Sequence, residues 1–417
     1  MPFLPDADQQ AVLDAPGTAW LRLIGEAGSG KTTTALLRAR ALAAAHRSPR
    51  TLVLSPTEEL AASLHGQARR IGGEVEVAAV GPWLHRQAEA LVGRWGMAEE
   101  APEAVVRAKR HPAVATVLEE LSWDHDEVAR SALHELFGDA RRRDALEDEA
   151  DGDLDPSTLD AVAAYVEVQF AELDRDEQGR PLRGMDGPIH RGTPLHDADT
   201  LDRGDAGALL ALGRLLRAPR PGHTHVVVDE AQEFSPLELA AAAAAVARGG
   251  ALTLAGDAGQ QLDAGAWFVG WAGVDVSLGR TPSACLLGGS HRCPPGVMDV
   301  ARAVRAGTVV PRADGPTVRW TTWASEAARQ ADVLSFDGVA VARDRRRART
   351  LQRRLGREVV PVDALRGREV SDVLLPDLSP EGWPDDAPGR RALYVALTRA
   401  RRSVWCGSAG PWTTLVA

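Results

Sequence analysis

The stretch GEAGSGKT at residues 25–32 decides how the first part of this 417-residue chain folds. It fits the pattern G-x-x-x-x-G-K-[ST], in which glycines let backbone N–H groups curl around phosphates. Lys31 is placed to meet the β- and γ-phosphates of a nucleotide, and Thr32 to offer its hydroxyl to Mg²⁺. The predicted nucleotide-binding residues of this phosphate loop are Gly25, Glu26, Ala27, Gly28, Ser29, Gly30, Lys31, Thr32 and the adjoining Thr33.

The segments on either side of the loop suit this interpretation. Residues 19–24 form a short apolar run that predicts a strand, and residues 33–42 are helix-like. The loop therefore opens a helix whose positive N-terminal end faces an anion. Lysine is rare in this chain, since only Lys31 and Lys109 are lysines among 48 lysine and arginine residues. A lysine inside a phosphate loop is hard to attribute to chance in such a composition.

Composition bounds the class of protein. The hydrophobic fraction of 44% and the charged fraction of 25% are ordinary for a soluble globular protein of two or three domains. The net charge of −10 does not indicate a nucleic-acid binder, although local patches matter more than the total. Three cysteines without a C-x-x-C pair predict a reducing compartment and no zinc site. We find no signal peptide or apolar span of about 18 residues, so we expect a cytoplasmic protein without membrane contact.

Strand-like and helix-like segments alternate over much of the chain, which predicts an α/β fold. Expected strands of a first block are residues 51–56, 75–80, 225–229 and 251–257, with a helix at 58–70. In a second block, from about residue 290, the expected strands lie near 318–322, 338–342, 359–362, 370–375 and 404–406, and the expected helices include 345–355 and 390–401.

Residues 96–200 have a different character. They are helix-like and are interrupted by an acidic run at 144–155, which we interpret as a solvated face or a linker. A Gly-, Pro- and His-rich stretch at 179–200 is expected to be a loop.

Two carboxylates follow the apolar run at 225–229, which is too short for a helix and rich in valine. A carboxylate at the end of a buried strand is where a P-loop ATPase holds Mg²⁺, so Asp229 suits that role together with Thr32. Glu230 is placed to orient or deprotonate an attacking water. The phosphate loop upstream favours this interpretation over an ordinary acidic helix start.

The order of these and further motifs resembles superfamily 1 helicases of the UvrD/Rep/PcrA type, including the HelD-like branch. The resemblance extends over nearly the whole chain outside residues 96–200, and motifs I, II, III and VI are its specific part. The matching segments are Gln9 (Q motif), 25–32 (motif I), 54–58 (Ia), DEAQ at 229–232 (II), GDAGQ at 256–260 (III), His291-Arg292 (IV), RGRE at 366–369 (V) and YVALTRA at 394–400 (VI).

The resemblance implies two RecA-like P-loop NTPase domains with ATP and Mg²⁺ in the cleft between them. Arg292 and Arg399 would reach the γ-phosphate from the second domain, and Gln260 would sense it. Glu369 would bind the ribose, and Gln9 and His291 would contact the adenine. The expected catalytic residues are Lys31, Asp229, Glu230, Gln260, Arg292 and Arg399. The implied domains are 1A (1–95 and 201–285), a mainly helical 1B-like insertion (96–200) and 2A (286–417).

The chain departs from the family pattern where relatives grip a nucleic-acid strand. Asp263 and Gly265 stand where relatives carry base-stacking aromatics, and either Trp267 or Phe268 replaces those rings or both belong to the core. Pro361 and Asp363 occupy the T-x-H positions before motif V, and no room remains between motifs IV and V for a large 2B domain.

An arginine-rich run at residues 343–357 offers a basic surface. It either binds phosphate backbones or forms a solvated helix that pairs with the acidic insertion. The leading hypothesis for function is an ATP-driven helicase or translocase on single-stranded DNA, with 3′–5′ polarity implied by the resemblance. The alternatives are a nucleotide-driven subunit that remodels a protein partner, such as RNA polymerase for the HelD-like branch, and a subunit of a larger nucleic-acid-processing complex. All three require the same ATP site.

Overall fold

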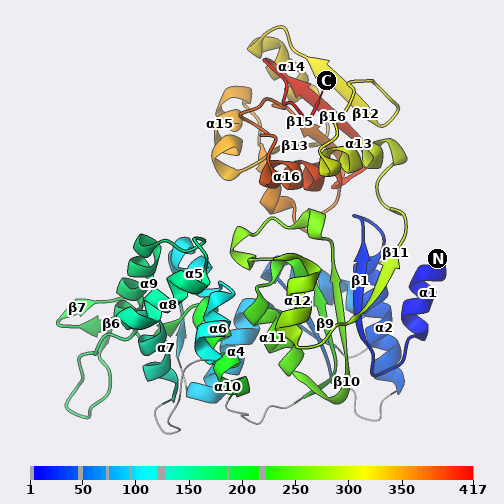
Figure 1. The fold of residues 1–417 in the computed structure, drawn as a ribbon. Coiled ribbons are helices and arrows are strands. Elements are labelled where there is room, and N and C mark those ends of the chain that lie inside the picture. Colours follow the sequence, from blue (N-terminus) through cyan, green and yellow to red (C-terminus); the bar gives the residue numbers. More distant parts are fainter. Residues whose placement is uncertain are drawn as a thin grey trace.

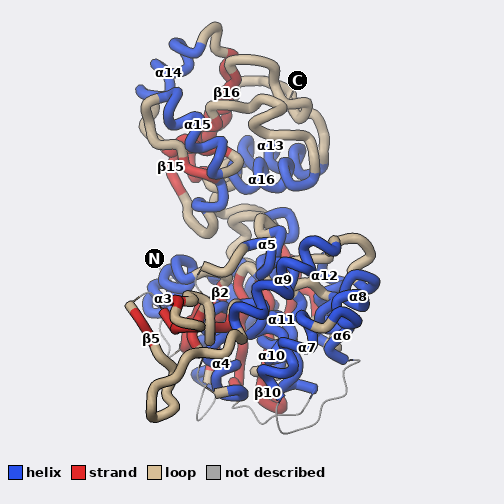
Figure 2. The backbone as a smooth tube through the Cα atoms, turned by 90° about the vertical axis from the view of Figure 1, so that its left-hand side faces the viewer, coloured by secondary structure: helices blue, strands red, loops and turns tan. Residues whose placement is uncertain are grey.

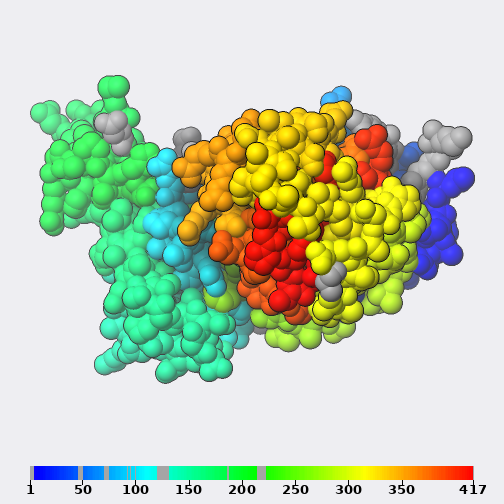
Figure 3. Space-filling view, turned by 90° about the horizontal axis from the view of Figure 1, so that it is seen from above, coloured from blue at the N-terminus to red at the C-terminus, as the bar shows by residue number. Residues whose placement is uncertain are grey.

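The computed structural model describes residues 4–45, 50–71, 75–93, 95–98, 100–119, 128–185, 187–215 and 222–416. Two α/β lobes lie one above the other, and a helical insertion projects from the side of the lower lobe (Figure 1). Figure 3, seen from above, shows the second lobe over the first and the insertion reaching beyond both. The fold is therefore α/β, with two parallel sheets of the RecA-like kind.

The sheet of the first lobe is six-stranded and parallel throughout, in the order β11-β1-β10-β9-β2-β3. The phosphate loop follows a strand inside this sheet, not one at its edge. The strands are β1 (Trp20–Gly25), β2 (Thr51–Ser55), β3 (Glu76–Ala79), β9 (His223–Asp229), β10 (Val246–Gly256) and β11 (Ser283–Leu287). The strands predicted at 19–24, 51–56, 75–80, 225–229 and 251–257 are confirmed within a few residues.

Helices cover both faces of this sheet, because alternate residues of each strand point to opposite faces. Val53 and Val227 pack with α1 (Ala7–Asp14), α2 (Lys31–Ala45) and α3 (Glu58–Ile71). Their neighbours Leu54 and Val228 pack on the other side. The helices of that side are α4 (Val80–Val92), α10 (Arg203–Leu215), α11 (Pro236–Ala244) and α12 (Gly270–Leu278).

The insertion is built mainly from helices α5 (Glu103–Lys109), α6 (Ala113–Glu119), α7 (Val128–Gly138), α8 (Ala140–Glu149) and α9 (Pro156–Gln169). Lys109 is fully buried there, and its Nζ donates to Gln169, Asp202 and Asp205. This charge-assisted cluster joins α5 and α9 to the start of α10.

Two expectations for the insertion can be compared with the structure. The acidic run at 144–155 spans the end of α8 and the turn to α9, where Asp155 caps α9. The stretch expected to be a loop contains short strands, which corrects that expectation. These are β5 (Arg183–Gly184), β6 (Gly187–His190) and β7 (Thr193–Pro194), with β8 (Thr200–Leu201) pairing with β4 (Gly96–Met97).

The second lobe has a five-stranded parallel sheet in the order β12-β16-β15-β13-β14. Figure 2 shows the same two-lobed arrangement from the side of the insertion. The strands are β12 (Val318–Thr322), β13 (Val339–Ala342), β14 (Val360–Pro361), β15 (Val370–Leu375) and β16 (Ala400–Ser408). The helices are α13 (Pro295–Ala306), α14 (Glu326–Ser335), α15 (Arg345–Leu355) and α16 (Ala387–Leu397).

The helix predicted at 390–401 is wrong at its C-terminal end. The helix α16 ends at Leu397, and Thr398 is its C-cap. Arg399 then lies in the turn before β16, where its carbonyl accepts a hydrogen bond from the backbone of Val370. The arginine of motif VI therefore lies in a tight turn between a helix and a strand, not on a helix.

Candidate functional site between the two lobes

The phosphate loop joins β1 to α2, and its glycines are required by close contacts. Gly28 and Gly30 have positive φ angles of 80° and 84°, which favour glycine. A Cβ on Gly28 would lie 2.5 Å from the Cβ of Arg292, and one on Gly30 would lie 2.6 Å from Nε2 of Gln9. The loop is therefore enclosed by the first helix on one side and by the start of the second lobe on the other.

Lys31 is held against its own loop. Its Nζ donates to the carbonyl oxygens of Gly25 at 2.8 Å and Glu26 at 3.0 Å. Burial lowers the pKa of Lys31, and the nearby carboxylates of Asp257, Glu230 and Asp229 partly oppose that effect. A buried ammonium that donates to two carbonyl oxygens is well placed to receive an anion.

Thr32 and Asp229 lie in direct contact. The Thr32 hydroxyl donates to Oδ1 of Asp229 at 2.9 Å. Burial, and next the adjacent Glu230, raise the pKa of Asp229 to about 7. The buried Asp229 carboxylate next to the half-buried Glu230 favours a cation at this point, and a hydroxyl beside a carboxylate suits Mg²⁺, which takes its remaining ligands from phosphates and water. The residues present therefore fit a Mg²⁺–nucleotide.

Glu230 is fixed by a chain of hydrogen bonds. Its backbone has φ 52°, and its Oε2 accepts from Nε2 of Gln232 at 2.7 Å. The Gln232 Oε1 accepts from the backbone N–H of Asp257 at 3.0 Å. Gln232 thus ties the carboxylate that follows β9 to the end of β10, so that Glu230 has a defined orientation.

Residues from the second lobe complete a cavity around the phosphate loop. Arg399 is 2% exposed, and its guanidinium donates to Oε1 of Gln260 from the first lobe. Arg292 makes an ion pair with Glu369, with 2.5 Å between Nε and Oε1. The predicted residues that line the cavity are Gly28, Gly30, Lys31, Thr32, Thr33, Asp229, Glu230, Gln260, Arg292, Glu369 and Arg399.

Gln9 and His291 lie elsewhere around the loop. The Gln9 side chain is 2% exposed, accepts from the backbone of Asp6 at 3.1 Å and donates to the carbonyl of Ser29 at 3.3 Å. The His291 ring lies 3.2 Å from a carboxylate oxygen of Asp6. Neither is among the described residues that line the cavity. Their role at the adenine stays a prediction, and in this structure Gln9 supports the loop.

The aromatic residues after motif III are engaged in the fold. The Trp267 Nε1 donates to the carbonyl of Arg107 in α5 at 2.7 Å, and the ring packs against His111. Phe268 packs edge-on against Trp271, with 5.3 Å between ring centroids. Of the two interpretations open for these rings, the structure favours packing within the first lobe and its insertion.

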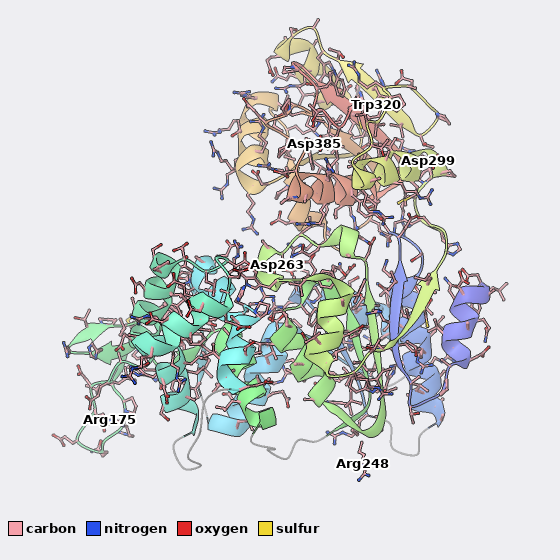
Figure 4. The ribbon with its side chains drawn as sticks, viewed as in Figure 1. Arg175, Arg248, Asp263, Asp299, Trp320 and Asp385 are labelled. Carbon is pink, nitrogen blue, oxygen red and sulfur yellow. The ribbon has the colours of Figure 1, made fainter. Side chains whose placement is uncertain are left out.

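Asp263 also has a structural partner. It pairs with the buried Arg110 of the insertion at 3.0 Å and lies at the top of the first lobe, toward the second (Figure 4). The backbone amide of Gly265 donates to the Asp263 carboxylate at 2.8 Å. The residue that replaces a stacking ring in this chain therefore joins the insertion to the motif III loop.

Sequence reasoning missed several residues at the lobe boundary. Glu26 was assigned to the phosphate loop, yet its carboxylate pairs with Arg302 and Arg305 of α13. Tyr394 belongs to motif VI, and the motif does not indicate that its hydroxyl contacts both Ala27 and Asp257. Sequence distance hides these contacts, because nothing local in residues 302–305 or at Tyr394 points to a partner some 270–370 positions away.

Comparison with known proteins finds a family match over the first part of the chain. Residues 7–105, which contain the phosphate loop, match the DEAD/DEAH box helicase family. This match supports a helicase-like motor in which ATP is the nucleotide, since that family uses ATP. No curated protein matches the chain. Among the described helices, none combines the length and apolar character needed to cross a bilayer.

One solved structure found by the comparison is titled "Complex structure of Arterivirus nonstructural protein 10 (helicase) with DNA". Its sequence is 13% identical to this chain, and the TM-score is 0.39. The alignment covers 96% of this chain and 62% of that one, so this chain spans less than two thirds of the length of the viral helicase.

Proposed function

We propose that this chain is an ATP-hydrolysing motor of the superfamily 1 type, similar to UvrD, Rep and PcrA, that moves along single-stranded DNA in the 3′–5′ direction. One observation carries the proposal. The cavity between the lobes brings Lys31, Thr32, Asp229 and Glu230 of the first lobe together with Arg292 and Arg399 of the second. These residues would supply a phosphate-binding lysine, two metal ligands, a general base and two arginines around one cavity.

The residues divide the chemistry among themselves. Lys31 leaves its two carbonyl partners to bind the β- and γ-phosphates, and Glu230 orients and deprotonates the attacking water. Thr32 and Asp229 hold Mg²⁺, which when bound neutralises charge on the phosphates. Arg399 and Arg292, from the second lobe, stabilise the negative charge of the transition state. Gln260 contacts the γ-phosphate and is hydrogen-bonded to Arg399, so it links the presence of that phosphate to the position of Arg399.

The domain boundaries that go with this proposal are 1A at 1–95 and 201–285, a 1B-like insertion at 96–200 and 2A at 286–417. Closing and opening of 1A and 2A around ATP would move the two lobes along a strand. The motor is a reduced one, because residues 293–365 between motifs IV and V leave no room for a 2B domain.

A second candidate is a nucleotide-driven remodelling subunit that acts on a protein partner or within a larger complex. It is favoured by the engagement of Asp263 and Trp267 with the insertion, since these positions hold no free ring for a base to stack on. Both candidates predict the same ATPase and differ in what stimulates it.

The experiment that tests the proposal is steady-state ATP hydrolysis by the purified chain, with and without single-stranded oligothymidine. We expect Mg²⁺-dependent hydrolysis that single strands stimulate and that blunt duplex DNA of equal length stimulates less. Hydrolysis without any response to DNA would favour the remodelling subunit. The absence of hydrolysis under both conditions would contradict both candidates.

The exposed face of α15 is a basic surface that this motor offers to a strand. Arg346, Arg349 and Arg353 are exposed and lie three and four positions apart, so they share one face of the helix. The ion pairs described for this arginine run go to Asp344, Asp363, Asp377 and Glu381 of the same lobe. Within the described residues, pairing with the acidic insertion is therefore not observed. The helix lies on the side of the second lobe that faces the insertion (Figures 1 and 2).

We predict weak binding of single-stranded DNA by the isolated chain, carried largely by this face. Replacing Arg346, Arg349 and Arg353 together by glutamine should reduce the slope of log K against log salt by about 2, since each phosphate contact on a single strand contributes about 0.7. Fluorescence anisotropy with labelled oligothymidine measures this slope.

The matched control replaces Arg141, Arg175 and Arg248, which are exposed and remote from α15, by glutamine (Figure 4 labels the latter two). It removes the same charge and should leave the slope within error of the wild type. Equal losses in the two triple variants would show that net charge, not this helix, governs binding.

A further inference from the structure

The second lobe contacts the phosphate loop at Glu26 and Ala27, which are not among the described residues that line the nucleotide cavity. Arg302 of α13 donates to both carboxylate oxygens of Glu26, at 2.8–3.0 Å, and Arg305 approaches the same carboxylate at 3.3 Å. The side chains are 22% exposed for Glu26, 44% for Arg302 and 40% for Arg305. This is a bidentate ion pair that remains accessible to salt.

A buried contact lies beside the ionic one. Tyr394 of α16 is fully buried, accepts from the backbone N–H of Ala27 at 3.3 Å and donates to Oδ2 of Asp257 at 3.1 Å. Arg305 covers the Tyr394 ring at 5.4 Å. Consecutive residues of the phosphate loop, Glu26 and Ala27, are therefore both held by the second lobe.

The contacts at Glu26 and Tyr394 are connected by hydrogen bonds to two residues of the ATP site, Lys31 and Arg399. On one side, the carbonyl of Glu26 accepts a hydrogen bond from Lys31, so the backbone that the second lobe holds also holds the lysine. On the other, Asp257 accepts from Gln260, whose Oε1 meets Arg399. The position of the second lobe is thus linked to Lys31 and to Arg399 through a few hydrogen bonds.

We infer that Glu26, Arg302, Arg305 and Tyr394 form an inter-lobe clasp that fixes the phosphate loop to the second lobe and positions Arg399 for ATP hydrolysis. The inference rests on the proposed function, and it adds positioning residues that lie outside the nucleotide cavity. The ion pairs of Glu26 with Arg302 and Arg305 are accessible to salt. As ionic strength rises, these pairs weaken, the two lobes are held less firmly in their relative orientation, and the rate of ATP hydrolysis decreases.

The test uses the full chain with Glu26→Gln, Arg302→Gln and both together. Each single change removes one charge of a partly exposed pair, so we expect kcat to fall by about twofold to fivefold. The double variant should be no slower than either single one, because both remove the same interaction. The KM for ATP and the affinity for ADP should change little, since the backbone cradle and Lys31 remain.

Salt dependence separates positioning from a general loss of stability. Wild-type kcat should decrease between low and high salt, whereas kcat of the Glu26→Gln variant should already be low and change little. Arg141→Gln, a charge removal on the exposed surface of α8, is the matched control and should follow the wild type. The reciprocal exchange Glu26→Arg with Arg302→Glu should restore part of the lost turnover and its salt dependence.

Small-angle X-ray scattering supplies a readout that needs no ATPase. At low salt the Glu26→Gln and Arg302→Gln variants should have a larger radius of gyration than the wild type, which should itself expand at high salt. If the wild type fails to hydrolyse ATP, the proposed function fails while scattering still tests the clasp. Additive effects of the two substitutions, or unchanged salt dependence with unchanged scattering, would overturn the clasp.

Discussion

Replacing Lys31 by alanine is expected to abolish ATP hydrolysis, reducing turnover to the background of the assay. Lys31 is the lysine of the phosphate loop, and its ammonium is buried beside the cavity, where it contacts the carbonyls of Gly25 and Glu26. Without it, the negative charge of the β- and γ-phosphates would meet no buried cation at this point. A coupled phosphate-release assay on the purified variant measures the loss.

Glu230→Gln is the informative companion to this variant. It removes the base and keeps the shape of the side chain, so ATP should still bind while turnover falls. Binding of a fluorescent ATP analogue separates the two cases, because Lys31→Ala should weaken it and Glu230→Gln should not. If Lys31→Ala hydrolyses ATP at the wild-type rate, the phosphate loop at residues 25–32 is not the ATPase site.

Replacing Arg399 by alanine is expected to lower kcat by about 10³–10⁵, the range known for arginine fingers, with little change in ADP affinity. Its guanidinium is buried at the cavity and bonded to Gln260, and burial lowers its pKa. Because this guanidinium is already held in place, it can stabilise the negative charge that develops during phosphoryl transfer without having to move first. Single-turnover hydrolysis measures the effect on the chemical step.

Arg292→Ala should act in the same direction, since Arg292 lines the same cavity and faces Glu369. Arg346→Gln on the exposed face of α15 is the control for a lost arginine in the second lobe. If kcat of Arg399→Ala falls by only tenfold or less, Arg399 does not act as an arginine finger.

The sequence was sufficient where short-range patterns carry the structure. Valine-rich residues 225–229 predicted a buried strand, and β9 lies inside the sheet. The spacing of the phosphate loop between a strand and a helix predicted its fold, because glycine and helix-terminus requirements are local. The α/β class followed from the alternation of such segments.

Long-range contacts account for what the sequence did not reveal. Residues 398–401 have helical propensity, yet the pairing of β16 with β15 ends α16 before Arg399. Trp267 could have been a stacking ring, and its bond to the carbonyl of Arg107 became visible only in three dimensions. The clasp on Glu26 depends on α13, which no local pattern connects to the phosphate loop.

The most direct test of the central claim is an experimental structure of the chain with Mg²⁺ and a non-hydrolysable ATP analogue. We expect the phosphates in the loop at residues 25–32, the metal between Thr32 and Asp229, and the guanidinium groups of Arg292 and Arg399 at hydrogen-bonding distance from the γ-phosphate. A nucleotide bound elsewhere, or either guanidinium turned away from the γ-phosphate, would contradict an ATPase site built from both lobes.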